Sequence, residues 1–110
     1  MSNYITFSIK VNNCSNNERK SFIKDLALLA DIILEQKADN EYSTCDVWNN
    51  YIKDLCLISK KYSNAIVTVD CNSDDDIWRV YFVNGKYQIA NGTIVYEEFD
   101  PLKLIDYEDE

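Results

Sequence analysis

Hydrophobic and polar residues alternate near the start of the chain, between Tyr4 and Val11. One side of this segment carries only apolar side chains, which is the two-residue period of a half-buried β-strand. The apolar positions are Ile5, Phe7, Ile9 and Val11. A polar segment follows, in which Ser15 and Glu18 have the spacing of a helix capping box. The pattern therefore predicts a strand and then a helix that begins near Ser15.

The hydrophobic period of this first helix continues to about Lys37. At 100° per residue, seven apolar side chains form one broad face. They are Phe22, Ile23, Leu26, Leu29, Ala30, Ile33 and Leu34. Leu28 falls in the opposite polar stripe and Ile32 at its border. We expect a neighbouring helix or the C-terminal tail to cover these two residues; the alternative is an exposed apolar anchor for a partner.

A second helix is predicted after a polar connection over residues 38–43, with Ser43 or Thr44 as its cap. Asp46 then lies in the first turn, where the helix dipole favours an anion. The apolar positions of this segment follow the three-and-four-residue spacing of one helix face. They are Val47, Trp48, Tyr51, Ile52, Leu55, Ile58 and Tyr62. We interpret this aromatic-rich face as part of the core.

The second half of the chain is predicted to form strands over residues 65–71, 77–83, 86–90 and 93–99. Asn-Gly dipeptides at 84–85 and 91–92 predict two-residue hairpin turns. The turns set the register, which places Phe82 opposite Tyr87 and Val80 opposite Ile89. The sheet face that we expect to be buried consists of Trp78, Val80, Phe82, Ile89 and Ile94, joined by Ile5, Phe7 and Ile9.

These elements predict a single α+β domain over residues 1–110, in the order β-α-α-β-β-β-β. An antiparallel sheet would pack its apolar face on two helices in a two-layer arrangement. Asp100 and Pro101 have the pattern of an N-cap and first helical residue, so a short C-terminal helix is expected within the acidic tail 101–110.

The charge balance narrows the classes of function. The chain has 11 Lys+Arg and 19 Asp+Glu, a net charge of −8, which disfavours direct binding to nucleic acid or to an anionic membrane. It contains no histidine, which excludes the Ser-His and Cys-His catalytic arrangements and removes the commonest metal ligand. No Gly-rich phosphate loop is present. We therefore expect no enzyme activity, no catalytic residue and no cofactor.

The four cysteines, Cys14, Cys45, Cys56 and Cys71, contain no C-x-x-C pair. The N-terminus has no secretory-signal pattern, and the longest apolar run is too short to cross a bilayer. We therefore expect reduced thiols in a cytoplasmic protein. Cys14 precedes a predicted helix N-terminus, where a thiol can become reactive, but we interpret it as an incidental surface thiol.

Oxygen-bearing side chains recur at every second position over Asp70, Asn72, Asp74 and Asp76. That spacing is typical of the start of a calcium loop. However, Asp75 stands where the sharp turn requires glycine, and strands flank the loop instead of helices. A solvated hairpin loop is the favoured interpretation, and a small metal- or ligand-binding module is kept as an alternative.

Acidic residues are concentrated in the second half of the chain: residues 62–110 contain 3 basic and 11 acidic residues. They form three clusters, Asp74, Asp75 and Asp76; Glu97, Glu98 and Asp100; and Asp106, Glu108, Asp109 and Glu110. Such clusters commonly serve solubility. They are also suited to meet a basic partner.

In size, charge, lack of histidine and these three clusters, the chain resembles phage-encoded anti-CRISPR and other anti-defence inhibitors. The resemblance implies a non-enzymatic protein that binds and inhibits a basic, nucleic-acid-handling immune effector, in some members by imitating the charge of DNA. Its location would be the cytoplasm of the bacterial host. The same features resemble immunity proteins and antitoxins that neutralise basic toxins. A homodimer formed through the patch around Leu28 is a further alternative to a monomer.

Overall fold

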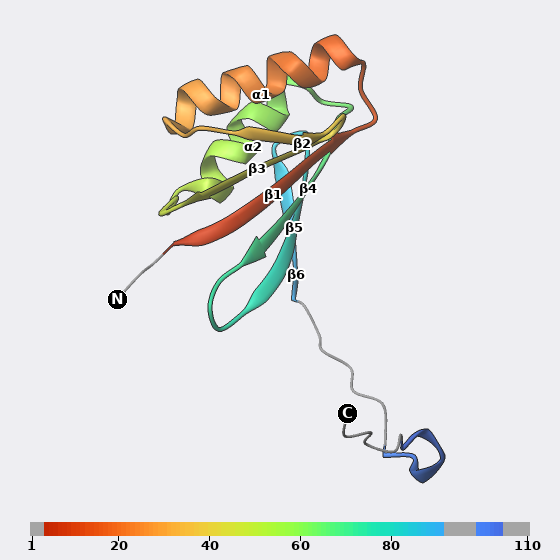
Figure 1. Cartoon of the computed structure of the whole chain (residues 1–110). Helices are drawn as coiled ribbons and strands as arrows, with labels where there is room; N and C mark the ends of the chain where they lie inside the picture. Colours follow the sequence, from red (N-terminus) through yellow and green to blue (C-terminus); the bar gives the residue numbers. More distant parts are fainter. Residues whose placement is uncertain (1–3, 92–98, 105–110) are drawn as a thin grey trace.

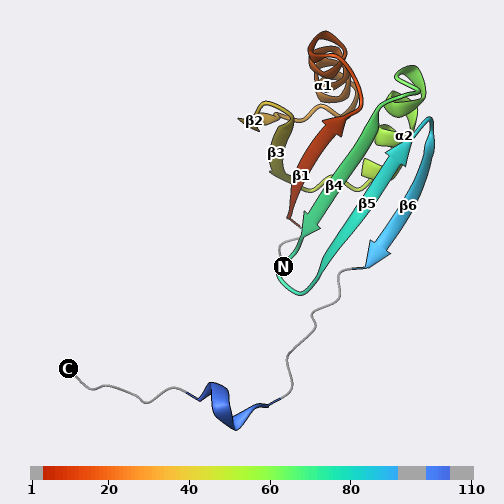
Figure 2. The ribbon, with the colours of Figure 1, turned by 90° about the vertical axis from the view of Figure 1, so that its right-hand side faces the viewer.

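A six-stranded antiparallel sheet forms the body of the protein, and two helices lie across one of its faces (Figures 1 and 2). The computed structural model describes residues 4–91 and 99–104. Its elements are β1 (Ile5–Asn12), α1 (Asn16–Ala30), β2 (Glu35–Ala38), β3 (Glu41–Asp46), α2 (Tyr51–Lys61), β4 (Ile66–Asn72), β5 (Ile77–Val83), β6 (Lys86–Asn91) and the 3-10 helix η1 (Pro101–Lys103). The sheet order is β2-β3-β1-β4-β5-β6. The predicted α+β class, with an antiparallel sheet and two helices, is confirmed.

The first four strands and both helices follow a split β-α-β arrangement. β1 and β2 are each antiparallel to β3, which lies beside both of them, so β1 and β2 run in the same direction without touching. β4 pairs with the other edge of β1. This is the ferredoxin-like β-α-β-β-α-β order, which the β5–β6 hairpin then extends beyond β4.

The region between Asp31 and Asp46 differs most from the prediction. α1 ends at Ala30 instead of near Lys37, because Asp31 adopts a left-handed conformation with φ 54°. The chain then forms β2 and β3 where the helical period predicted the end of one helix and the start of the next. β3 pairs along its whole length with Ile5–Lys10 of β1, and this tertiary pairing overrides the local helical preference. The element order is therefore β-α-β-β-α-β-β-β.

The predicted helix starts are correct for one helix and wrong for the other. Ser15 caps α1 through the capping box, since its side chain accepts from the backbone of Glu18 while the Glu18 carboxylate accepts from that of Ser15. α2 begins only at Tyr51. Trp48 thus precedes the helix, but it is buried and its Nε1 donates to Asp54 Oδ2 at 2.9 Å. Its predicted place in the core is confirmed.

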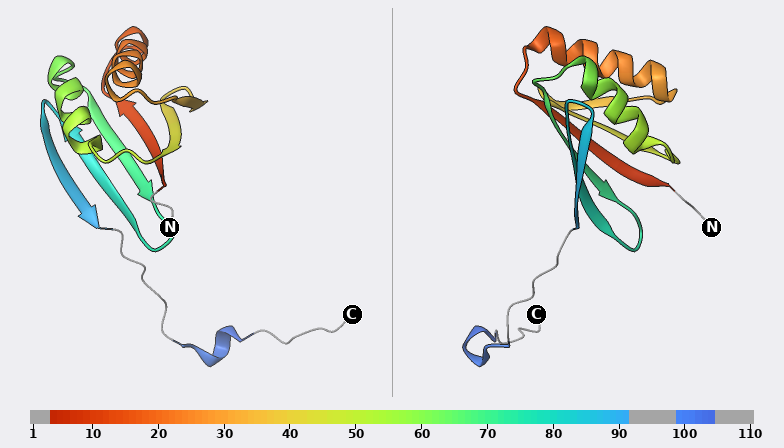
Figure 3. Two further views of the ribbon diagram at one scale, coloured as in Figure 1. Left: turned by 90° about the vertical axis from the view of Figure 1, so that its left-hand side faces the viewer. Right: turned by 180° about the vertical axis from the view of Figure 1, so that it is seen from behind.

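The core lies between the helices and the three central strands β1, β4 and β5. Its most deeply buried side chains are Phe7, Ile9, Val11, Phe22, Leu26, Leu55, Val67, Val69, Val80 and Phe82. The prediction fails at the outer strand, where Tyr87 and Ile89 are 54% and 48% exposed although they share the face of Phe82 and Val80. Beyond α2, no described element covers that side of β6 (Figure 3).

The β5–β6 hairpin has the predicted register, with Phe82 opposite Tyr87 and Val80 opposite Ile89. Its turn residues Asn84 and Gly85 have φ values of 48° and 79°, as a two-residue hairpin turn of this type requires. The predicted strand 93–99 falls almost entirely on residues 92–98, outside the described residues, and so does Ile94.

The chain is described again from Phe99 to Leu104. Asp100 Oδ1 accepts from the backbone of Leu102 at 3.0 Å, and Pro101 is the first residue of η1. The predicted N-cap and helix start are therefore confirmed. The predicted extension of the helix to about Glu108 is wrong at Leu104, whose extended backbone (ψ 136°) ends η1 at Lys103. Residues 105–108 lie outside the described residues.

Candidate functional site

One end of the sheet gathers carboxylates from separate parts of the chain. The register sets Asp46 of β3 opposite Ile5, and Thr6 opposite Asn72, which leads into the β4–β5 loop. The C-terminal end of α1 reaches the same end, because Asp31 and Asp46 line one groove. We call this region the acidic end; it comprises Asp31, Glu35, Asp46, Asp70, Asp74, Asp75 and Asp76.

The β4–β5 loop presents the carboxylates of Asp74 and Asp75 at a hairpin tip. The Ser73 N–H donates to the Asp76 carbonyl at 2.9 Å, and the Asp76 N–H donates to Ser73 Oγ at 3.1 Å. Asp76 Oδ1 also accepts from the Ile77 N–H at 2.9 Å, so this carboxylate partly serves the turn. All three aspartates are exposed, and none takes part in an ion pair with a described residue. The loop therefore holds two carboxylates in solvent on a locally ordered turn.

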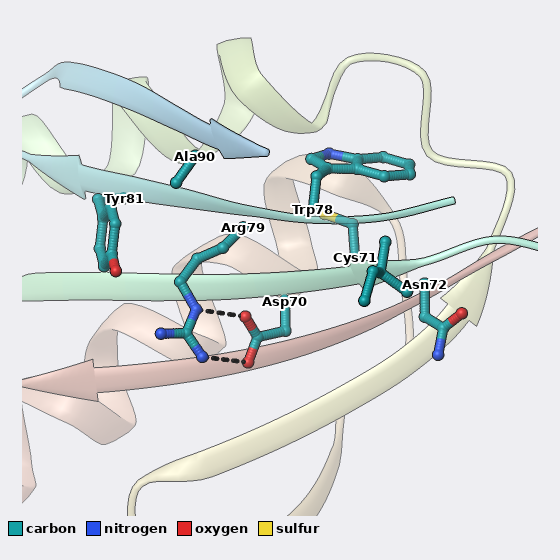
Figure 4. A pocket seen from close by; sticks show the side chains of 8 residues that line it. Asp70, Cys71, Asn72, Trp78, Arg79, Tyr81 and Ala90 are labelled. Atoms are coloured by element: carbon teal, nitrogen blue, oxygen red, sulfur yellow. Dashed lines mark hydrogen bonds and ion pairs between the residues drawn. The ribbon is translucent and has the colours of Figure 1, made fainter. Parts of the chain in front are cut away.

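Asp70 and Arg79 form a bidentate ion pair on the sheet face that the helices leave open (Figure 4). Arg79 Nε and Nη2 both donate to the Asp70 carboxylate, the latter at 3.1 Å. This pair, helped by Tyr81, raises the pKa of Arg79 above its usual range. Both side chains are nearly half exposed, so the pair adds little stability. Arg79 therefore neutralises Asp70, whereas the aspartates of the neighbouring β4–β5 loop have no ion-pair partner among the described residues.

A groove of about 480 Å³ adjoins this ion pair. Ala90 lies directly opposite Arg79 in the β5–β6 register, and its small side chain leaves space beside the guanidinium. Tyr81 borders the groove on the same face. Asn72 and Ile77, which also line it, are the paired residues next to the β4–β5 loop. The groove is large enough to hold a side chain.

Asp70, Asn72, Asp74 and Asp76, whose spacing is typical of the start of a calcium loop, do not converge on one point in the described structure. Asp70 is occupied by Arg79, and Asp76 accepts from the backbone of its own turn. Within residues 4–91 and 99–104, no three or more Cys, Asp or Glu side chains are grouped so that they could hold one metal ion. The loop instead has the hydrogen bonds of an ordinary hairpin connection.

Leu28 and Ile32, the predicted apolar pair, have different environments. Leu28 is 74% exposed, so the expectation that a neighbouring element covers it is wrong for the described structure. Ile32 is partly buried against the core. Leu29 and Ile33, which were expected on the buried face, are 48% and 87% exposed. The early end of α1 explains Ile33, since residues beyond Ala30 no longer follow the helical period. Leu29 lies within α1, on a part of its face that the described core covers only in part.

The remaining predicted acidic residues contribute little to the described surface. Asp100 is half-buried and caps η1. Glu97, Glu98, Asp106 and Glu108 lie outside the described residues. Six of the 19 acidic residues fall in the ranges 92–98 and 105–110, so the described residues contain 13 acidic and 11 basic ones. The described residues are therefore nearly balanced in charge, so a negative surface on them depends on where the acidic side chains lie.

All four cysteines are free thiols, as expected. Burial raises the pKa of Cys14, against a smaller lowering by Arg19, which disfavours a thiolate at the start of α1. Burial also raises the pKa of Cys71 to about 12. Cys45 is exposed on β3.

The sequence alone missed two carboxylates of the acidic end. Asp31 falls within the span predicted as the first helix, and Asp46 in the predicted first turn of the second. No local pattern reveals their proximity, because it depends on β3 pairing with β1. The Asp70–Arg79 pair could have been predicted from the sequence, because the short loop between β4 and β5 places these two residues opposite each other.

Comparison with known proteins adds no relative: no family model, no curated protein and no solved structure matches the chain. Across the described residues, the structure contains no helix with the length and apolar character needed to cross a membrane.

Proposed function

We propose that this protein is a non-enzymatic inhibitor that binds a basic, nucleic-acid-handling protein through its acidic end, in the manner of phage-encoded anti-defence proteins. The observation that carries the proposal is the pair Asp74 and Asp75, which are exposed on an ordered hairpin tip without a described cation beside them. Asp31 and Asp46 extend the negative surface along the same end of the sheet.

The spacing of these charges suits a channel that normally holds a nucleic-acid backbone. Adjacent strands lie about 4.8 Å apart, so the three steps from β3 across β1 and β4 to β5 span about 14 Å. Carboxylates at both ends of this row would compete with phosphates for the lysines and arginines that line such a channel. Charge complementarity of this kind acts mainly on the rate of association and weakens with salt. In this proposal the protein acts in the bacterial cytoplasm, where its four free thiols stay reduced.

The test begins with the protein immobilised and exposed to a lysate of bacteria that carry CRISPR nucleases and other defence proteins. Bound proteins are eluted by a salt gradient and identified, and a purified binder is then tested for loss of DNA or RNA binding when the protein is added. We expect a basic binder whose association with the wild-type protein is faster at low salt and which cannot hold nucleic acid at the same time. A toxin as the binder would assign the chain to the immunity proteins instead.

The Asp74→Asn/Asp75→Asn variant removes two charges from the loop tip without touching a turn hydrogen bond. The matched control is Asp39→Asn/Glu41→Gln, which removes the same charge near the β2–β3 turn, at the other end of the sheet. The loop variant should slow association several-fold at low salt, and the control should not. If both variants associated with the partner as fast as the wild-type protein does, the proposal would be contradicted.

A further inference from the structure

A second groove, of about 430 Å³, lies between the end of α1 and the edge of β3. Its lining includes Ile32 and Ile33 from the segment after α1 and Thr44, Cys45 and Asp46 from β3. Ile33 is 87% exposed, and Leu29 at the end of α1 is 48% exposed. The groove is therefore an open trough with one apolar wall and one wall made by a strand edge.

The strand edge in this groove lacks a neighbour in the part of the chain that the structure describes. β2 pairs with β3 only from Glu41 to Ser43, since Glu35, its first residue, lies opposite Ser43. β3 continues to Asp46, and the outer side of Thr44–Asp46 has no described strand beside it. An uncovered strand edge presents backbone N–H and C=O groups that an extended chain can pair with.

The charge of the groove decides which kind of chain it favours. Of its nine lining residues three are carboxylates, Asp31, Glu35 and Asp46, and none is basic. Lys37 pairs with Glu35 at 3.0 Å, whereas Asp31 and Asp46 have no ion-pair partner among the described residues. An acidic segment would be repelled here, and a basic one would find both complementary charge and an apolar surface at Ile33.

The geometry points to a docking site for an extended basic segment of a partner protein, which adds a short strand beside Thr44–Asp46. Its lysine or arginine side chains would face Asp31 and Asp46, and an apolar side chain would cover Ile33. The inference deepens the proposed function, on which it rests for the basic character of the partner. It adds a contact by strand pairing to the long-range attraction exerted by the loop at Asp74 and Asp75.

Titration of the isotope-labelled protein with a blocked hexapeptide of alternating lysine and valine tests this site by NMR. We expect amide shifts at Thr44, Cys45, Asp46 and Ile33. A hexapeptide of alternating lysine and proline has the same charge but cannot pair along a strand. It should shift these amides far less. Equal shifts from the two peptides, or shifts confined to residues 73–76, would overturn the inference.

The variant for this site is Asp31→Asn/Asp46→Asn, because asparagine tolerates the left-handed conformation at 31 and can still accept the hydrogen bond from the Val47 N–H at 46. It should weaken binding of the lysine-valine peptide about three- to tenfold, the size expected for two exposed ion pairs. Asp39→Asn/Glu41→Gln is again the charge-matched control and should bind as wild type does. An unchanged affinity in the first variant would overturn the docking site. The proposed function would still stand if partner binding remained sensitive to Asp74→Asn/Asp75→Asn.

Discussion

The two outer hairpins of the sheet, β2–β3 and β5–β6, are held in different ways. β5–β6 is tied to α2 at both ends, since Trp78 Nε1 donates to Tyr51 Oη at 3.0 Å and the Gly85 N–H donates to Ser59 Oγ at 2.9 Å. Among the described residues, the β2–β3 turn is hydrogen-bonded to the end of β1: the Val11 N–H donates to the Asn40 carbonyl, and Asn40 Nδ2 donates to Asn12 Oδ1.

The difference also appears in burial. β5 contributes Val80 and Phe82, both fully buried, whereas β2 is exposed along its length and β3 buries mainly Tyr42. β5–β6 has its own apolar alternation and Asn-Gly turn, whereas β2–β3 forms because β3 pairs with the edge of β1. In this short, polar hairpin β2 pairs with only part of β3, and the second groove lies beside the residues of β3 that β2 leaves uncovered.

The largest effect should come from removing the anchor of β5. Phe82→Ala should destabilise the protein by about 3–5 kcal/mol, because Phe82 is fully buried and a cavity would remain. Ile89→Ala on the paired strand is the matched control and should cost only about 0.5 kcal/mol, since half of that side chain is in solvent. Urea unfolding measures both. Similar losses for the two variants would show that Ile89 is covered in solution.

A smaller effect should follow from cutting the tie between the β5–β6 turn and α2. Ser59→Ala leaves the Gly85 N–H without its acceptor in a partly buried site and should cost about 1–3 kcal/mol. The Gly85 amide should then exchange with solvent faster than its neighbours. Ser63→Ala, an exposed serine just after α2, serves as control. Unchanged exchange at Gly85 would mean that the tie does not hold the turn.

The thiols of β3 and β4 should differ in how fast they react in the folded protein. Cys45 on β3 is exposed and should react quickly with a thiol reagent in the folded protein, whereas Cys71 on β4 should react only on unfolding. Burial raises the pKa of Cys71 to about 12, so its thiol stays protonated at neutral pH and lacks the reactive thiolate. Mass spectrometry over time, with Cys45→Ser to assign the fast site, provides the measurement. Equally fast labelling of Cys71 would reveal opening of the central strands.

The candidate site was predictable where it depends on local sequence. Asp74 to Asp76 were correctly placed in the loop between two strands, because alternation on either side defines both strand ends. The environment of Leu28 was not predictable, since it depends on whether another element packs on that face of α1, and among the described residues none covers it. Asp31 and Asp46 were also missed, because two residues fifteen positions apart come together only through the pairing of β3 with β1.

The amino-acid sequence by itself determined β1, the capping box of α1, the apolar face of α2 and the register of the β5–β6 hairpin. In each case the signal is local: a side-chain period of two or of about 3.6 residues, a capping pair or an Asn-Gly turn. The tertiary structure alone decided that residues 35–46 form strands and that Tyr87 and Ile89 of β6 remain about half exposed on the helix side. A strand edge can recruit a short polar segment whatever its own preference, because backbone hydrogen bonds gained along β1 outweigh a fraction of a kcal/mol per residue of helix propensity.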